Sequence, residues 1–147
     1  MMDAETLEAE GWERLPTHAF SLVIGSTWIT GEPGNRTVGL IADPVAVNEN
    51  IGIVHGGALM TFADVALGAG VADVIGHANC ATAQLQFQFA SAARAGSFIT
   101  CNPEVVRKTS QLVFIRGLIE ADSRTIGAAD AIFKILEQEK MEKLRSG

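Results

Sequence analysis

The sequence predicts an α+β fold in which one curved antiparallel sheet packs against a single long buried helix. Residues 58–75, ALMTFADVALGAGVADVI, are small or apolar on almost every side, which is typical of a helix surrounded by other structure. Residues 81–90 alternate polar and apolar side chains, which is typical of an antiparallel strand with one apolar face. Two strand candidates precede the helix in the sequence and four follow it, so the predicted element order is β-β-α-β-β-β-β.

The chain before the long helix predicts a short helix and a hairpin. Residues 2–10 are expected to form the short helix. Residues 19–30 and 37–41 are rich in strand-forming side chains, and the GEPG segment between them predicts the turn of a hairpin. A loop then leads to His55-Gly56-Gly57, directly before the long helix.

Four strands are expected after the helix, with turns near residues 92–96, 108–110 and 122–124. On the first of them, Thr82, Gln84, Gln86 and Gln88 share one predicted face. Pro103 indicates an edge position or a bulge, because proline donates no hydrogen bond to a neighbouring strand. The other three strands are expected at 97–107, 111–121 and 125–136, and a solvent-exposed helical end at 137–147.

The composition predicts one soluble domain over residues 1–147, with its core at about 18–136. Of the 147 residues, 48% are hydrophobic and 19% are charged, which excludes a disordered chain. A net charge of −6 argues against a nucleic-acid partner. Two aspartates interrupt the most apolar stretch, 58–76, so no membrane partner is expected. Two unpaired cysteines and an acidic N-terminus without a signal peptide favour the cytoplasm.

Gly56 and Gly57 form the first candidate functional feature because they lead directly into the helix. The first N–H groups of a helix lack internal acceptors and carry the positive end of its dipole. They can therefore bind an anion or a polarised carbonyl oxygen. Alternatively, the two glycines only allow a tight turn and close packing, and their spacing leaves both interpretations open. No metal site is expected, since the three histidines lie far apart in sequence.

Asp64 is the second feature. Helical geometry places it beside Met60, Thr61, Leu67 and Gly68, on an almost apolar face. Burying an unpaired carboxylate costs free energy, so such a position favours a catalytic role. Asp73 faces the opposite side of the helix and is expected to have a structural partner near the helix end.

The separation of Gly57 and Asp64 predicts a site shared between subunits. Seven residues of helix span about 10 Å, so one carbonyl carbon cannot reach both groups in the same chain. If both act on one substrate, they come from different subunits. A homo-oligomer would also cover the sheet face that a single helix leaves bare.

The segment Gly52-Ile-Val-His55-Gly56-Gly57, with an acid seven residues after the second glycine, resembles the hotdog-fold acyl-CoA thioesterases of the phenylacetyl-CoA and hydroxybenzoyl-CoA thioesterase group. The resemblance in element order extends over about residues 18–136. It implies a hotdog fold, with the sheet wrapped around the helix, and dimers whose active sites lie at the subunit interface, with a tetramer as the expected assembly. It also implies hydrolysis of an acyl-CoA to acid and CoA, without a cofactor beyond the CoA of the substrate.

The resemblance also implies roles for individual residues. The Gly57 N–H would polarise the thioester carbonyl, with Gly56 in the substrate-binding turn. Asp64 of the partner subunit would be either a general base for water or a nucleophile that forms an anhydride. Thr82 would orient the water, or be an ordinary hydroxyl on the sheet face. His55 would brace the loop, as a structural or a catalytic residue.

One position departs from the family pattern. Glu49 stands where the family often has asparagine, with Asn48 and Asn50 on either side. We expect Asn50 to supply the polar contact on the carbonyl side, through a one-residue shift of the loop. The alternative is that Glu49 takes this place as an extra acid.

The phosphates of CoA require cations, and residues 94–124 are the one net-positive stretch, with five bases and three acids. Arg94, Arg107 and Lys108 are therefore expected near the mouth of the site, although ordinary surface charge explains them as well. Two other functions stay open. One is dehydration of a hydroxyacyl thioester, which uses His55 and the helix acid. The other is a non-catalytic acyl-CoA-binding module.

Overall fold

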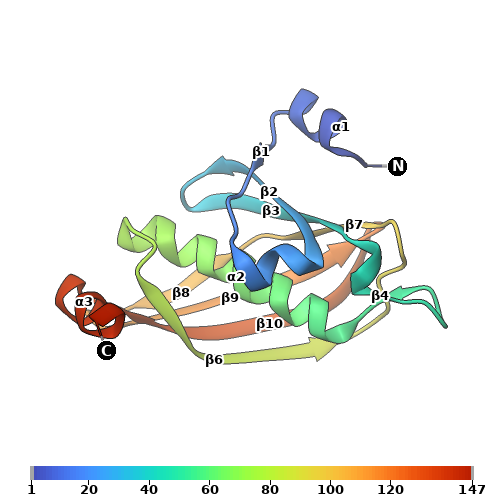
Figure 1. Ribbon diagram of the computed structural model, residues 1–147. Coiled ribbons are helices and arrows are strands. Elements are labelled where there is room, and N and C mark those ends of the chain that lie inside the picture. The colour runs from blue at the N-terminus through green and yellow to red at the C-terminus, as the bar shows by residue number, and fades with distance from the viewer. Residues whose placement is uncertain (1, 147) are drawn as a thin grey trace.

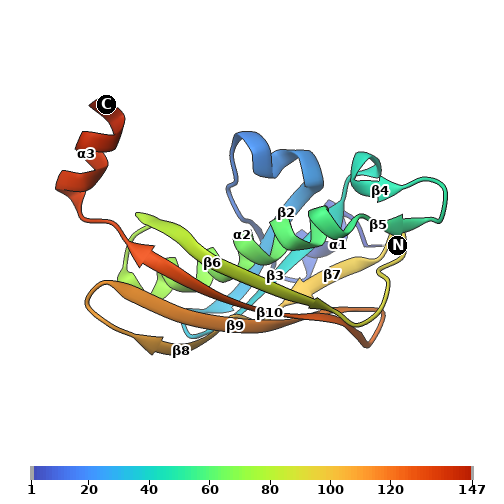
Figure 2. The same ribbon diagram turned by 90° about the horizontal axis from the view of Figure 1, so that it is seen from below.

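One long helix lies along one face of a curved antiparallel sheet, as the computed structural model shows (Figure 1, Figure 2). The structure describes residues 2–146, so the two end residues of the predicted 1–147 domain lie outside the described part. The predicted α+β class is confirmed. The long helix is α2 (Gly56–Ile75), close to the expected range of 58–75.

The main sheet has eight strands, in the order β1-β2-β3-β7-β9-β10-β6, with β8 paired to β9. Their bounds are β1 (Glu13–Arg14), β2 (Gly25–Glu32), β3 (Asn35–Ala42), β6 (Cys80–Phe89), β7 (Phe98–Cys101), β8 (Glu104–Lys108), β9 (Leu112–Ala121) and β10 (Arg124–Ile135). The remaining elements are α1 (Ala4–Ala9), η1 (Ala19–Ile24), η2 (Pro44–Ala46), the small hairpin of β4 (Val47–Asn48) and β5 (Ile53–Val54), and α3 (Gln138–Ser146).

The core forms between α2 and the concave face of the sheet. Leu59, Phe62 and Leu67 of α2 are buried there against the sheet. Gly70 allows close packing, because a Cβ at this position would lie 2.6 Å from the Cβ of Pro103. By length and composition alone α2 could also cross a membrane, but core helices of soluble proteins pass the same test. Leu59, Phe62 and Leu67 of α2 are buried here in the core.

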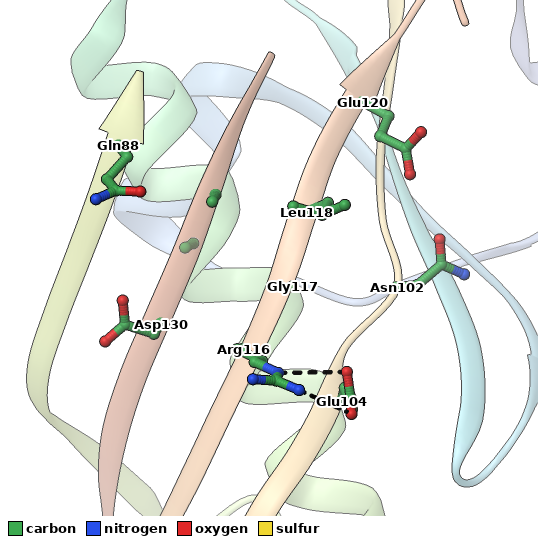
Figure 3. Close-up of a pocket in the computed structure, with 10 residues that line it drawn as sticks. Gln88, Asn102, Glu104, Arg116, Gly117, Leu118, Glu120 and Asp130 are labelled. Carbon is green, nitrogen blue, oxygen red and sulfur yellow. Dashed lines mark hydrogen bonds and ion pairs between the residues drawn. The ribbon is translucent and has the colours of Figure 1, made fainter. Parts of the chain in front are cut away.

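The N-terminal segment covers part of the sheet face that points away from α2. Trp28 pairs with Gly39 on this face and is buried, and Arg14 lies over its ring at 5.1 Å. Trp12 meets Phe98 edge-on, with ring centroids 5.2 Å apart. The rest of the face, over β6, β9 and β10, remains open and contains a shallow hollow of about 570 Å³, in which Arg116 pairs with Glu104 (Figure 3).

Two of the predicted strands need correction. Residues 19–24 form the 3₁₀ helix η1 instead of the start of a strand, because the chain turns at Ala19, with φ 50°, and bends again at Gly25, with φ 134°. An apolar run does not by itself distinguish these conformations. The expected strand 97–107 is interrupted at Asn102-Pro103 and forms β7 and β8. The bulge or edge expected from Pro103 is confirmed, since β8 pairs with β9 alone among the described strands and has a register shift.

The predicted face of Thr82 is also wrong. Leu85 pairs with Ala131, but Phe133 pairs with Thr82, so Ala83 is an extra residue in β6. This bulge reverses the alternation, because two residues of the bulged strand oppose one residue of its partner. Thr82 therefore faces α2 with Leu85, and it is separated from the row of Gln84, Gln86 and Gln88.

Candidate active site

The N-terminus of α2 is capped by the histidine that precedes it. The Gly57 N–H donates to His55 Nδ1 at 3.2 Å, and the N–H groups of Ala58 and Leu59 donate to the His55 carbonyl oxygen. The Thr61 hydroxyl donates to the Gly57 carbonyl oxygen at 2.9 Å. His55 therefore braces this turn. Its imidazole accepts the hydrogen bond of the Gly57 N–H, the group that the resemblance assigns to the substrate carbonyl.

The glycine pair lies beside an aromatic side chain of β6. A Cβ on Gly56 would lie 3.3 Å from the Phe89 ring. The centroid of this ring is 4.4 Å from that of Phe87, and the two ring planes are tilted by 35°. Phe89 is 55% exposed, so one side of its ring is free at the start of the helix. Gly57 is exposed, and a Cβ there would make only an ordinary contact with His55. The two glycines therefore allow close access to the first helical turn.

The hairpin β4–β5 leads the chain into this turn. The backbone N–H of Asn50 donates to Asn48 Oδ1 at 3.2 Å, which places Asn50 in the turn of a hairpin that projects from the body of the protein (Figure 1). Glu49 lies in the same turn and is exposed. Neither side chain has a described contact with Asp64 or Gly57, so the choice between them stays a prediction.

Asp64 and Thr82 come together across the gap between α2 and β6. The Thr82 hydroxyl donates to Asp64 Oδ1 at 2.5 Å. Asp64 is partly buried and Thr82 is exposed. This contact exists because the bulge at Ala83 turns Thr82 toward the helix. The hydrogen bond restricts the orientation of the carboxylate.

A groove of about 320 Å³ opens at this pair of residues. Apart from Asp64 and Thr82, its lining comes from α2, β6 and η1: Phe20, Ser21, Met60, Thr61 and Leu85. The arrangement holds one carboxylate, three hydroxyl groups and three large apolar side chains. Such a site can activate a water molecule next to an apolar group.

Cys80 lies on the same face of β6, close to Asp64. Burial raises the pKa of its thiol, and the negative charge of Asp64 raises this pKa further. Sequence reasoning missed Cys80 and also missed Phe20 and Ser21. Residues 19–24 look like a strand in the sequence, so no sequence signal placed Phe20 and Ser21 at the groove.

The cationic residues are distributed over both ends of the helix. Arg94 is exposed and forms a β-bridge with Ile53, close to the glycine pair. Arg107 and Lys108 lie on β8, which follows Pro103, the residue packed against Gly70. Gly70 is about 20 Å along the helix axis from Gly56. Of these three predicted residues, only Arg94 is therefore near the N-terminus of α2 within one chain.

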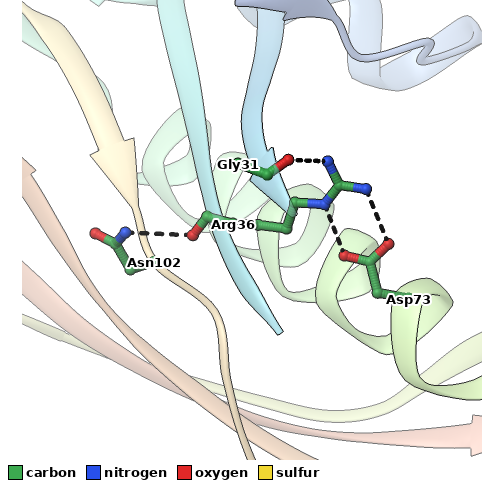
Figure 4. A network of polar contacts seen from close by, with 4 residues as sticks. All are labelled: Gly31, Arg36, Asp73 and Asn102. Carbon is green, nitrogen blue, oxygen red and sulfur yellow. Dashed lines mark hydrogen bonds and ion pairs between the residues drawn. The ribbon is translucent and has the colours of Figure 1, made fainter. Parts of the chain in front are cut away.

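Asp73 has the structural partner that the sequence predicts. Arg36 Nε donates to Asp73 Oδ2 at 3.0 Å, and Arg36 Nη1 donates to the Gly31 carbonyl oxygen (Figure 4). Asn102 adds a hydrogen bond to the Arg36 carbonyl oxygen at 3.2 Å. This network joins the β2–β3 turn to the C-terminal part of α2. Among residues 2–146, no three His, Cys, Asp or Glu side chains gather closely enough to hold a metal ion.

A family model decides the relationship of this chain to known proteins. The model described as the thioesterase superfamily matches residues 51–128, which include the glycine pair, Asp64 and Thr82. The chain belongs to the thioesterase superfamily. No curated protein matches it in sequence.

Solved structures show the same hotdog fold. A mutant of the phenylacetic acid degradation protein PaaI from Thermus thermophilus is 15% identical, with a TM-score of 0.64 over 90% of this chain and 99% of that chain. A phenylacetic acid degradation-related protein from Ralstonia eutropha is 18% identical, with a TM-score of 0.65 over 92% of both chains. Zebra fish thioesterase superfamily member 2 is 16% identical, with a TM-score of 0.66 over 75% of this chain and 81% of that chain.

Proposed function

We propose that this protein hydrolyses an acyl-CoA thioester to the free acid and CoA, at a site shared by two subunits. The observation that carries the proposal is the Asp64 carboxylate, held by Thr82 in a largely apolar groove. This carboxylate lies on the helix whose first turn contains the glycine pair. Membership of the thioesterase superfamily supports this chemistry in general.

In the proposed reaction the thioester carbonyl oxygen accepts a hydrogen bond from the Gly57 N–H and replaces His55 Nδ1 as the acceptor. This interaction stabilises the negative charge that develops on the oxygen. Asp64 of the partner subunit removes a proton from water while the water oxygen adds to the carbonyl carbon. The C–S bond then breaks, and the CoA sulfur leaves as a thiolate that takes up a proton.

Direct attack by Asp64 is the second form of the reaction. It would give a mixed anhydride and CoA, and water would then hydrolyse the anhydride. Mass spectrometry of the acid-quenched protein during the first turnover distinguishes the two forms, because only the anhydride adds the mass of the acyl group to the chain.

The edge of the sheet supports the proposed dimer. Within the described structure β6 pairs with β10 on one side only, and its other edge is open. An open edge of this length favours pairing with a second chain. Antiparallel pairing of two β6 strands about a two-fold axis would place two α2 helices side by side in opposite directions. Asp64 of one subunit would then approach Gly57 of the other.

The same dimer would place cations from both chains around the substrate. Arg94 lies near Gly57 of its own chain. Arg107 and Lys108 lie toward the other end of α2, so the partner's Arg107 and the partner's Lys108 would approach the same mouth. We propose that these residues bind the phosphates of CoA. The tetramer and the cytoplasmic location expected from the sequence stay predictions.

The deciding experiment measures thiol release from short, long and aromatic acyl-CoAs by wild type, Asp64→Asn and Asp130→Asn. Asp130 is the control, because it is an exposed carboxylate on the opposite face of the sheet. We expect Asp64→Asn to lose about 100-fold or more in kcat, as for removal of a general base, while Asp130→Asn keeps wild-type activity. Equal activity of all three proteins would contradict the proposal. Binding of acyl-CoA by wild type without any release would favour a binding module.

A further inference from the structure

We infer that the groove at Asp64 holds the acyl group of the substrate and selects apolar, uncharged acyl chains, with Phe20 of η1 as the side chain that sets this specificity. The inference rests on the proposed hydrolysis of acyl-CoA thioesters and assigns the part of the substrate that the groove receives.

The position of Phe20 is the first observation. Phe20 lines the groove together with Met60 and Leu85, so an apolar wall from three different elements faces the Asp64 carboxylate. The Phe20 side chain is 66% exposed, whereas Phe62 on the core face of α2 is fully buried. A ligand that covers a large exposed apolar side chain removes apolar surface from water, which favours binding of an apolar group at that place. An acyl chain attached to the reacting carbonyl lies within reach of this wall.

The charge of the groove is the second observation. Among the described residues that line it, Asp64 alone is charged, and its charge is negative. A carboxylate at the far end of an acyl chain would therefore be repelled and would find no cation among the residues that this chain contributes to the lining. An alkyl or aryl acyl group meets no such repulsion. The lining therefore favours a hexanoyl group over a glutaryl group.

The experiment compares kcat/KM for acetyl-CoA, hexanoyl-CoA and glutaryl-CoA in wild type and three variants. Phe20→Ala should lower the ratio of hexanoyl to acetyl kcat/KM about tenfold, because the loss of one or two methylene contacts in an apolar pocket changes kcat/KM by about this factor. We expect most of the change in KM. Ser21→Arg places a cation in the lining and should raise the ratio of glutaryl to hexanoyl kcat/KM at least about tenfold. Leu22→Ala is the control, since Leu22 is 51% exposed on η1 but does not line the groove.

Each outcome is decisive. An unchanged hexanoyl-to-acetyl ratio in Phe20→Ala, or the same change in Leu22→Ala, would overturn the inference while leaving hydrolysis established. A sedimentation experiment that shows dissociated subunits for Phe20→Ala alone would assign Phe20 to the subunit interface and would also overturn it. If wild type releases thiol neither from these three substrates nor from the long and aromatic acyl-CoAs of the first experiment, the proposed function itself fails.

Discussion

Thr82 orients the Asp64 carboxylate through a hydrogen bond of 2.5 Å. A hydrogen bond to a charged group contributes about 1.5–3 kcal/mol, so its removal should be visible in the rate. We expect Thr82→Val to lower kcat about tenfold or more, because the carboxylate then samples unproductive orientations. Thr82→Ser keeps the hydroxyl and should retain most of the activity.

Steady-state measurement of kcat and KM checks this prediction, with Gln84→Ala as a control from the outer face of the same strand. A wild-type kcat in Thr82→Val would show that the hydroxyl has no part in orienting the acid.

The two cysteines allow a test of the surroundings of Asp64 that needs no substrate. The raised pKa of Cys80 lowers the thiolate fraction at pH 8 and slows alkylation relative to free cysteine, because the thiolate is the reactive form. Asp64→Asn removes one cause of this shift, so the Cys80 pKa falls and alkylation by iodoacetamide becomes faster. Burial, and then Glu120, raise the pKa of Cys101 to about 12, so Cys101 should react only after unfolding.

Peptide mass spectrometry of each cysteine over time measures both rates in the native protein. The same Cys80 rate in wild type and Asp64→Asn would contradict the placement of the carboxylate beside this thiol.

At the scale of elements, the ion pair between Arg36 and Asp73 joins the β2–β3 hairpin to α2. Its side chains are only 24% and 20% exposed, and the guanidinium also donates to Gly31. We expect Arg36→Ala to lower the free energy of unfolding by about 1.5–3 kcal/mol, because it removes charged hydrogen bonds from a partly buried site.

Urea denaturation measures this loss, and Arg116→Ala provides a matched control. Arg116 pairs with Glu104 at 3.4 Å, but these side chains are 60% and 64% exposed. An exposed pair contributes about 0–1 kcal/mol, so this variant should unfold close to wild type. Equal losses in both variants would show that burial of the Arg36 pair adds no stability.

At the scale of the whole molecule, the proposed reaction requires Gly57 of one subunit and Asp64 of the other to meet across a subunit boundary. Gly57→Pro removes the N–H group at a position in the first turn where proline is tolerated, and Asp64→Asn removes the acid. Each variant alone should be inactive. A heterodimer of the two has one site in which both groups are intact, so statistical mixing should restore about a quarter of wild-type activity.

Thiol release after joint unfolding and refolding of the two variants, at equal concentrations, measures this recovery. Each variant refolded by itself is the control. Absence of recovery in a preparation that sedimentation shows to contain dimers would contradict the shared site. Sedimentation of wild type also tests the predicted tetramer directly.

The sequence by itself determined the features that depend on residues close together along the chain. The apolar composition of 58–75 was sufficient to predict α2, since a helix that is apolar all round requires burial. The glycine pair with Asp64 seven residues later pointed to the thioesterase group, and their separation along the helix led to the expectation of a shared site. The turn residues between β2 and β3 predicted their pairing.

The tertiary structure alone decided which way particular side chains face. Thr82 reaches Asp64 because β6 pairs with β10 through a bulge at Ala83, and that register depends on strands far apart in sequence. Phe20 enters the groove because Ala19 and Gly25 bend an apolar segment into η1. The alternation of a strand and the apolarity of a run are local properties. Packing against distant parts of the chain sets the bulge in β6, the bend of η1 and the contact of Pro103, just before β8, with α2. Only the folded molecule therefore shows these three features.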